Sequence, residues 1–188
     1  MTSPLLKIHD LTLVRGGRRL LEGFHLALGP GDAVLVTGQN GAGKSSLLRV
    51  AAGLLRPTTG HVDRGAAALV DENAALDERL TLGRALGFWA KLDGGDADAG
   101  MEAMGIGHLS AVPVRMLSTG QRKRAALARL IASDRPLWLL DEPANGLDAD
   151  GLVRLAAAMA EARKAGRAIL AASHQPIGLG DHRTVDLA

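Results

Sequence analysis

The sequence predicts one α/β domain that combines a mostly parallel sheet with an N-terminal antiparallel β subdomain and a helical insert. Three observations support this fold class. The apolar run AVLVT ends in a glycine-rich turn that opens a helix, as strands of a parallel sheet do. Two further apolar strands, LWLL and AILAA, alternate with helices toward the C-terminus. Between these parts lies a stretch with helical periodicity, which we assign to the insert.

Composition excludes several classes of protein. The 188 residues are 47% hydrophobic, which is enough for one buried core. The net charge is only +2, a weak argument for a nucleic-acid partner, and the absence of cysteine excludes disulfides and thiolate metal sites. Charged residues interrupt every candidate run of about 18 apolar residues. We therefore expect contact with a membrane only through a partner.

The first predicted elements are short strands and one helix. Two β-rich stretches separated by RGGRR predict an antiparallel hairpin, and AVLVT predicts a buried strand that leads into a helix. The segment LRPTTGHV ends this helix with Pro and Gly, and two strand pieces follow. The predicted ranges are strands at 5–14, 20–28, 33–37, 60–64 and 66–70, and a helix at 44–54.

The later elements alternate between helix and strand. Residues 71–114 have a helical pattern, strongest in LTLGRALGFWAKL and broken by a predicted loop at LDGGDADAG. A helix then follows LSTGQ, and strands at 137–140 and 168–172 flank a helix at 151–164. We therefore predict one domain with a catalytic core of residues 1–71 and 115–188 and a helical subdomain of residues 72–114.

The segment GQNGAGKS matches the pattern G-x-x-x-x-G-K-[ST] between a buried strand and a helix, which disfavours a merely flexible turn. Its glycines let successive N–H groups turn toward phosphate oxygens, and the helix dipole adds partial positive charge. Lys44 can reach the β- and γ-phosphates of a nucleotide, and the Ser45 hydroxyl can bind Mg²⁺. The predicted phosphate-binding residues are Gly38, Gln39, Asn40, Gly41, Ala42, Gly43, Lys44, Ser45 and Ser46.

Acidic residues follow the second buried strand in LWLLDEP. Asp141 is predicted to hold Mg²⁺ through water, and Glu142 is a candidate general base for the attacking water. His174 follows the strand AILAA. Because the carboxyl ends of parallel strands meet at one edge of the sheet, we expect Asp141, Glu142 and His174 to lie together, where His174 can donate to the γ-phosphate.

The segment LSTGQ has an ordinary explanation when taken alone. Ser118 and Gln121 have the S-x-x-Q spacing of a capping box, which satisfies the free N–H groups of the helix that follows. A capped helix with a small hydroxyl and a glycine in its first turn is also an anion site. The basic residues that come next, Arg122, Lys123 and Arg124, predict a solvated or phosphate-near face rather than a nucleic-acid patch.

The order of these motifs resembles the nucleotide-binding domain of ABC ATPases. The phosphate loop, a helical insert, LSTGQ, the DEP segment, NGLD and SH follow one another from Leu5 to His174, which is almost the whole chain. The resemblance implies a P-loop NTPase with a RecA-like core that hydrolyses ATP with Mg²⁺. It also implies that LSTGQ is the family's signature motif. Its residues, Leu117, Ser118, Thr119, Gly120 and Gln121, would bind the γ-phosphate of an ATP held by a second copy of the chain, with Asp148 at the shared interface.

At finer grain the chain resembles the ATP-binding subunits of cytochrome c biogenesis, the CcmA family of haem exporters. The stretches that carry this are VRGGRRLLEG, FWAKL, RPLWLLDEP and SHQP. The resemblance implies a peripheral position on the cytoplasmic face of a bacterial inner membrane, an integral CcmB-like permease subunit and other Ccm components. The work of the complex would be haem delivery or export, or release of a haem-loaded chaperone.

Two positions depart from the wider ABC pattern. The aromatic residue that stacks on adenine should fall near Arg15, and an Arg guanidinium can stack on a base in its place. The loop Gln that senses the metal has only Glu72 and Asn73 as nearest equivalents. Phe88 and Trp89 are predicted either to face a membrane subunit or to pack in the core of the insert.

Three alternative functions stay open at this point. The ATPase could serve an ABC transporter for another cargo, since the cargo path lies in other chains. A soluble ABC ATPase acting on DNA or ribosomes is disfavoured because the chain has no room for a coiled-coil insert or a second cassette. A cassette that binds ATP without hydrolysis is disfavoured by Glu142 and His174.

Overall fold

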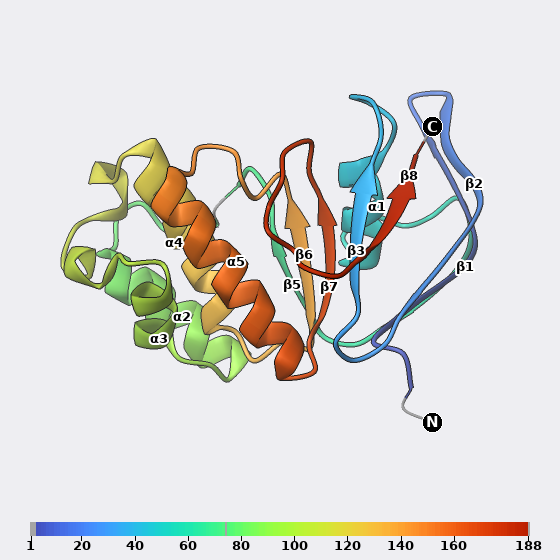
Figure 1. Ribbon diagram of the computed structural model, residues 1–188. Coiled ribbons are helices and arrows are strands. Elements are labelled where there is room, and N and C mark those ends of the chain that lie inside the picture. The colour runs from blue at the N-terminus through green and yellow to red at the C-terminus, as the bar shows by residue number, and fades with distance from the viewer. Residues whose placement is uncertain (1–2, 74, 188) are drawn as a thin grey trace.

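The computed structural model describes residues 3–73 and 75–187, which form two β-sheets with helices packed around them (Figure 1). An antiparallel sheet has the strand order β2-β1-β4, and a five-stranded parallel sheet has the order β5-β6-β7-β3-β8. The strands are β1 (Leu6–Arg15), β2 (Arg18–Leu28), β3 (Ala33–Thr37), β4 (Thr59–Arg64), β5 (Ala67–Val70), β6 (Leu137–Asp141), β7 (Ala168–Ala172) and β8 (Arg183–Asp186).

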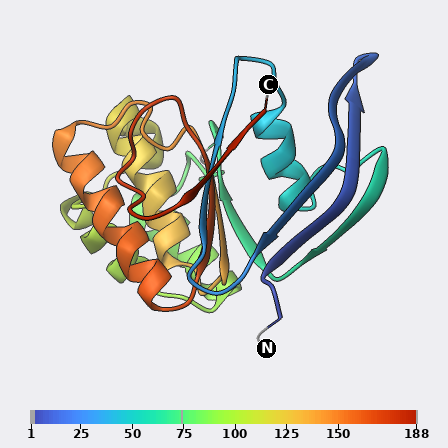
Figure 2. The ribbon, with the colours of Figure 1, turned by 45° about the vertical axis from the view of Figure 1, so that its right-hand side comes forward.

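Helices cover the parallel sheet on both faces, as a buried parallel sheet requires. Helix α1 and the antiparallel sheet lie on one face, and the remaining α-helices lie on the other (Figure 2). The helices are α1 (Lys44–Ala51), α2 (Leu82–Asp93), α3 (Ala97–Ala103), α4 (Thr119–Ala132) and α5 (Ala149–Lys164), with 3₁₀ turns at Gly107–Leu109 and Val114–Met116. No helix in the described part of the chain is long and apolar enough to cross a membrane.

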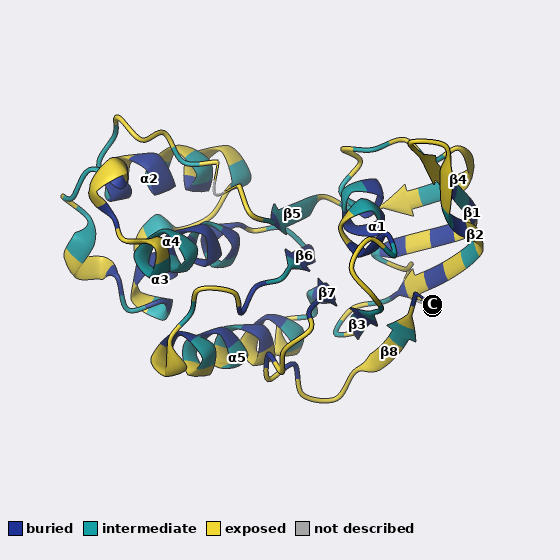
Figure 3. Cartoon of the chain, turned by 90° about the horizontal axis from the view of Figure 1, so that it is seen from above, coloured by how far each residue is buried: buried dark blue, intermediate teal, exposed yellow. Residues whose placement is uncertain are grey.

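Strand β6 shows how the sequence specifies this two-sided burial. The parallel sheet has one hydrophobic core on each face. The apolar residues of β6 alternate between these two cores, because successive side chains of a strand point to opposite faces. Leu137 and Leu139 pack with α1 and the antiparallel sheet, whereas Trp138 and Leu140 pack on the helical side. Viewed from above, β6 and β7 are largely dark blue and lie between α4 and α5 on one side and α1 with the antiparallel sheet on the other (Figure 3). The continuous apolar runs LWLL and AILAA therefore mark strands buried on both faces.

The predicted hairpin is confirmed, but the predicted helix at 44–54 is three residues too long. Strand β1 pairs with β2 in antiparallel register, from Leu6 opposite Leu28 to Arg15 opposite Arg18. Helix α1 ends at Ala51, and Gly53 has a φ of +73°. A left-handed residue just past the last turn ends a helix, and glycine adopts this conformation without steric cost.

The helical pattern predicted from residue 71 is wrong for the described residues 71–73 and 75–81, none of which is helical. The Asp71 side chain accepts the N–H of Asn73, and the Asp77 side chain accepts the N–H of Arg79, both at 2.9 Å. Such local side-chain hydrogen bonds offer the backbone an alternative to helix. The first regular helix of the insert, α2, begins only at Leu82.

Two further differences concern short elements. The predicted loop LDGGDADAG contains the start of α3, because the Asp96 side chain accepts the N–H groups of Asp98 and Ala99 and so caps a helix. Strand β8 was not predicted. It pairs with the outer side of β3, and its residues are exposed or half-buried, so it carries no apolar run that a sequence pattern could detect.

Candidate functional site

The phosphate loop runs from the end of β3 into α1. Gly43 precedes the helix with a φ of +106°, and Gly38 has a φ of +134° close to the backbone of Leu187. Lys44 is only 7% exposed, and its Nζ donates to the carbonyl oxygens of Gly38 at 2.7 Å and Gln39 at 3.1 Å. The loop thus curls around a buried cation, which gives it the charge that phosphate oxygens require.

A cavity of about 410 Å³ opens beside this loop, and it brings together residues that are far apart in the sequence. Glu142 and His174 reach it from the ends of β6 and β7, and Arg15 reaches it from the end of β1. One cavity is therefore lined by Glu142, the predicted base, by His174, the predicted donor to the γ-phosphate, and by Arg15, the predicted neighbour of adenine. The lining residues are Arg15, Leu20, Asn40, Gly41, Gly43, Lys44, Ser45, Ser46, Glu142 and His174.

Glu142 and His174 form a pair at the carboxyl edge of the parallel sheet. The Glu142 Oε1 atom lies 3.1 Å from His174 Nε2, within ion-pair distance but outside hydrogen-bond geometry. The other oxygen, Oε2, accepts the His174 backbone N–H at 3.4 Å. The same edge places Asp141 one residue earlier, at the end of β6. The adjacency expected for Asp141, Glu142 and His174 is therefore present.

The donor set around Asp141 fits a magnesium ion. Asp141 Oδ1 is buried and has no hydrogen-bond partner among the described residues. Ser45 and Asp141 both line a second, larger cavity of about 850 Å³. Mg²⁺ is usually bound by one or two protein oxygens together with substrate phosphates and water, so one hydroxyl and one carboxylate are enough.

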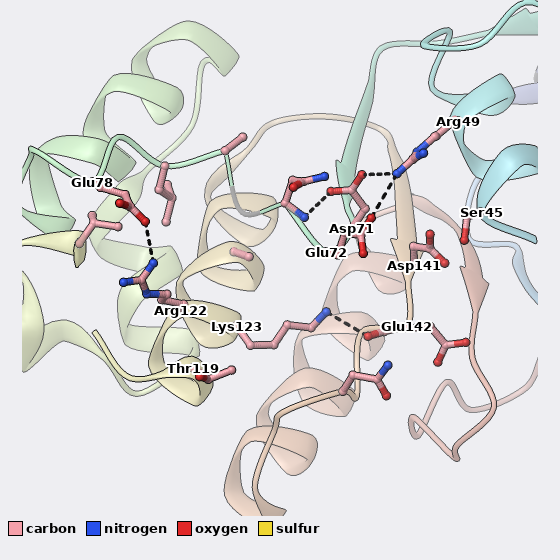
Figure 4. A pocket seen from close by; sticks show the side chains of 16 residues that line it. Ser45, Arg49, Asp71, Glu72, Glu78, Thr119, Arg122, Lys123, Asp141 and Glu142 are labelled. Carbon is pink, nitrogen blue, oxygen red and sulfur yellow. Dashed lines mark hydrogen bonds and ion pairs between the residues drawn. The ribbon is translucent and has the colours of Figure 1, made fainter. Parts of the chain in front are cut away.

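This larger cavity lies between the strand edge and the insert (Figure 4). Glu72 and Asn73, the nearest equivalents of the loop Gln, line it together with Asp71. Arg49 of α1 holds this loop, with its Nη2 at 3.4 Å from Asp71 Oδ2 and 3.8 Å from Glu72 Oε1. Arg49 and Asp71 were not singled out from the sequence, because no motif contains them.

The segment LSTGQ forms the capping box that its spacing predicts. Ser118 Oγ accepts the Gln121 N–H at 3.3 Å, and Gln121 Oε1 accepts the Ser118 N–H at 2.9 Å. None of the residues 117–121 lines the cavity beside the phosphate loop of the same chain, although Thr119 lines the larger cavity. The cap of α4 therefore contributes nothing to its own chain's phosphate-loop cavity.

The three basic residues after LSTGQ do not form one solvated face. Lys123 is half-buried, and its Nζ donates to the Glu142 carbonyl oxygen at 2.9 Å. Burial lowers the pKa of Lys123, while the nearby carboxylates of Asp141, Glu142 and Asp71 act in the opposite direction. Arg124 pairs with Asp148, which caps α5 by accepting the Gly151 N–H at 3.0 Å. The sequence signal that could have found Lys123 is weak, because a lysine next to apolar helix positions commonly extends into solvent.

The two aromatic residues of α2 take different environments. Phe88 is 60% exposed. Trp89 is half-buried, donates from Nε1 to the Ala75 carbonyl oxygen at 2.8 Å, and carries the Arg129 guanidinium 3.7 Å above its ring. Trp89 thus contacts both the insert, at Ala75, and α4, at Arg129, rather than a core of the insert alone, whereas Phe88 presents an apolar surface.

Comparison with known proteins agrees with this geometry. The family model described as ABC transporter matches residues 21–145. A relative from Sphingopyxis alaskensis named "Cytochrome c biogenesis ATP-binding export protein CcmA" is 54% identical over 94% of this chain and 93% of its own length. A relative of the same name from Zymomonas mobilis is 48% identical, over 97% of this chain and 84% of its own length.

Solved structures agree in fold. A structure described as the ATP-binding subunit of an ABC transporter has a TM-score of 0.83 at 25% identity, covering 90% of this chain and 79% of the other. The cbiO1 structure from Clostridium perfringens, described as part of the ABC transporter complex cbiONQ, has a TM-score of 0.74 at 25% identity, with coverage of 92% and 79%. The chain therefore belongs to the ABC transporter family, within which it is an ATP-binding domain that hydrolyses ATP.

Proposed function

We propose that two copies of this chain bind ATP between them and energise a membrane complex of c-type cytochrome biogenesis. One observation supports the part of the proposal in which two copies share the ATP site. Lys44, Glu142 and His174 converge on one cavity, yet LSTGQ lies outside it. A second copy arranged head to tail would supply the missing cap to that cavity, as a closed two-fold pair allows.

The chain's own residues divide the work of hydrolysis. The phosphate loop and Lys44 bind the β- and γ-phosphates, and Arg15 stacks on the adenine. Glu142 orients and deprotonates the attacking water, and His174 donates to the γ-phosphate. Ser45 and Asp141 would hold Mg²⁺, which offsets phosphate charge when it is bound. Loss of the γ-phosphate removes the ligand that joins the two copies, so hydrolysis opens the pair.

The role of LSTGQ can be tested with a substitution that keeps the cap and changes the charge. Asp caps helices as well as Ser does, so Ser118→Asp should preserve the melting temperature while its carboxylate repels the partner's γ-phosphate. We expect wild-type ATPase rate to rise faster than linearly with protein concentration. Ser118→Asp should lose at least about 10-fold in rate, corresponding to about 1.4 kcal/mol of barrier, with ATP binding retained.

The control is Ser3→Asp, which makes the same charge change at an exposed residue far from any motif. It should behave like the wild type. A rate that is linear in concentration and unchanged in Ser118→Asp would reduce LSTGQ to a helix cap and refute the paired site.

The assignment to cytochrome c biogenesis rests on the relatives' printed names and needs its own experiment. In a bacterium that lacks its own CcmA relative, expression of this chain should restore c-type cytochromes, and Glu142→Gln should not. The chain should also co-purify with a CcmB-like permease from membranes, as we expect of a peripheral subunit on the cytoplasmic face. Active ATPase that restores no cytochrome and co-purifies with another permease would assign it a different cargo.

A further inference from the structure

The main chain at Glu142 has an unusual conformation. Its φ is +44°, in the left-handed region that residues other than glycine rarely adopt. Such a conformation persists only where surrounding contacts hold it, and the contacts here are specific. The Glu142 N–H donates to the Ala172 carbonyl oxygen at 2.8 Å, and its carbonyl oxygen accepts from Asn145 N–H at 3.3 Å. The base therefore leaves β6 at an angle that β7 and the following turn hold from two sides.

Lys123 holds this peptide from a third side. Its side chain crosses the larger cavity from α4, and Nζ donates to the Glu142 carbonyl oxygen at 2.9 Å (Figure 4). This hydrogen bond joins two segments that were assigned to different sites. Helix α4 begins at the Ser118 cap, and Glu142 faces the cavity beside the phosphate loop.

Stability alone does not explain a lysine at this position. Taking an ammonium group out of water is unfavourable, and burial lowers the Lys123 pKa despite three carboxylates nearby. An apolar side chain of similar length would fill the same path without this cost. The charge is therefore better explained by what it contacts than by what it adds to folding.

We propose that Lys123 is a positioning residue for the catalytic base. Its ammonium holds the Glu142 peptide in the left-handed conformation that directs the carboxylate toward His174 and the phosphate loop. Lys123 lies on the helix that Ser118 caps, so a single helix carries both the proposed signature cap and the contact to this chain's own base. The inference rests on the proposed role of Glu142 as base and adds a residue that acts through it.

Lys123→Met tests this role, because methionine is close to lysine in length and cannot donate a hydrogen bond. We expect kcat to fall at least about 10-fold, corresponding to about 1.4 kcal/mol of barrier, with the dissociation constant for ATP within about 2-fold of wild type. Lys123→Arg restores a donor and should recover most of the rate. The melting temperature of Lys123→Met should equal or exceed that of the wild type, since the buried charge is gone.

A double-mutant cycle separates this role from a general structural effect. If Lys123 acts through Glu142, Lys123→Met should slow single-turnover hydrolysis by less than about 2-fold in a Glu142→Gln background. The control is Lys164→Met, which removes an exposed lysine on α5 and should leave the rate unchanged. Equal losses in both backgrounds, or no loss in the wild-type background, would overturn the role of Lys123. Wild-type turnover in Glu142→Gln alone would instead refute the base.

Discussion

At the scale of single residues, the site depends on groups that are buried although they are polar. Lys44 is enclosed by the carbonyls of its own loop, and Asp141 has a buried oxygen with no protein partner in the described chain. Glu142 has a buried oxygen near His174. Each of these groups carries a solvation cost in the absence of a ligand, and each has the chemistry to contact one part of Mg·ATP. Their roles can therefore be separated by single substitutions.

Glu142→Gln and Lys44→Ala should affect different steps. The glutamine keeps the shape of the side chain and one acceptor oxygen, but it replaces the other oxygen with an NH2 donor and cannot accept a proton. We therefore expect ATP binding to persist while turnover falls by about 10²- to 10⁴-fold. Lys44→Ala removes the buried cation that the loop encloses, so ATP affinity itself should fall. Fluorescent nucleotide titration and ATPase assays distinguish the two. A Glu142→Gln variant that turns over at the wild-type rate would contradict the assignment of the base.

At the scale of elements, the insert is built on close approach between helices. Helix α3 packs against α4 at Gly100, where an added Cβ would overlap the carbonyl oxygen of Ala128 and approach Ala132. Gly87 of α2 shows the opposite environment, because an added Cβ there meets nothing within 4 Å. Glycine is therefore required by close packing at Gly100 but not at Gly87, although both residues lie in helices of the same insert.

We predict opposite effects of alanine at these two positions. Gly100→Ala should separate α3 from α4 and destabilise the domain by about 1–3 kcal/mol, as overpacked cores are. Gly87→Ala should stabilise it by about 0.5–1 kcal/mol, because alanine loses less backbone entropy in a helix. Thermal unfolding followed by circular dichroism measures both. Equal shifts for the two variants would show that the α3–α4 contact is less close than described.

At the scale of the whole molecule, an ion-pair network joins α4 to α5, and a hydrogen bond from the same network reaches the insert. Arg124 of α4 pairs with Asp148 and Asp150 and also donates to the Met104 carbonyl oxygen at 2.9 Å. Arg154 of α5 pairs with Asp150 at 2.8 Å. The hydrogen bond from Arg124 lowers the pKa of Asp148, and those from Arg154 and then Arg124 lower the pKa of Asp150.

The sign of these shifts predicts acid sensitivity. A carboxyl group whose pKa is lowered by folding stabilises the fold above its ordinary value of 3.8 and loses this contribution as pH falls through the folded pKa. We expect Asp148→Asn/Asp150→Asn to melt below the wild type at pH 6, and we expect this difference to shrink as the pH falls below the ordinary carboxyl value of 3.8. Asp181→Asn, at an exposed residue with no ion pair in the described chain, is the control. A constant difference between the double variant and the wild type across this range would contradict the ion-pair origin.

The sequence by itself determined most of the elements, apart from α3 and β8, and much of the site. Where a motif is local, pattern was sufficient: GQNGAGKS adopts the strand-turn-helix geometry it predicts, and Ser118 and Gln121 make both hydrogen bonds of the capping box. The continuous apolar runs of β6 and β7 also identified strands buried on both faces, which placed Asp141, Glu142 and His174 at one edge. In each case the information lies within a few residues, so neighbouring side chains are enough to specify the conformation.

Only the tertiary structure decided the contacts between distant segments. No pattern indicates that Lys123 reaches Glu142, that Arg49 holds Asp71, or that Arg124 pairs with Asp148, because each pair joins separate elements through long polar side chains. Strand β8 escaped prediction since its pairing with β3, rather than its own apolar content, makes it a strand. Residues 71–81 were predicted as helix because their composition permits one, and the turns at Asp71 and Asp77 depend on local hydrogen bonds that periodicity does not encode.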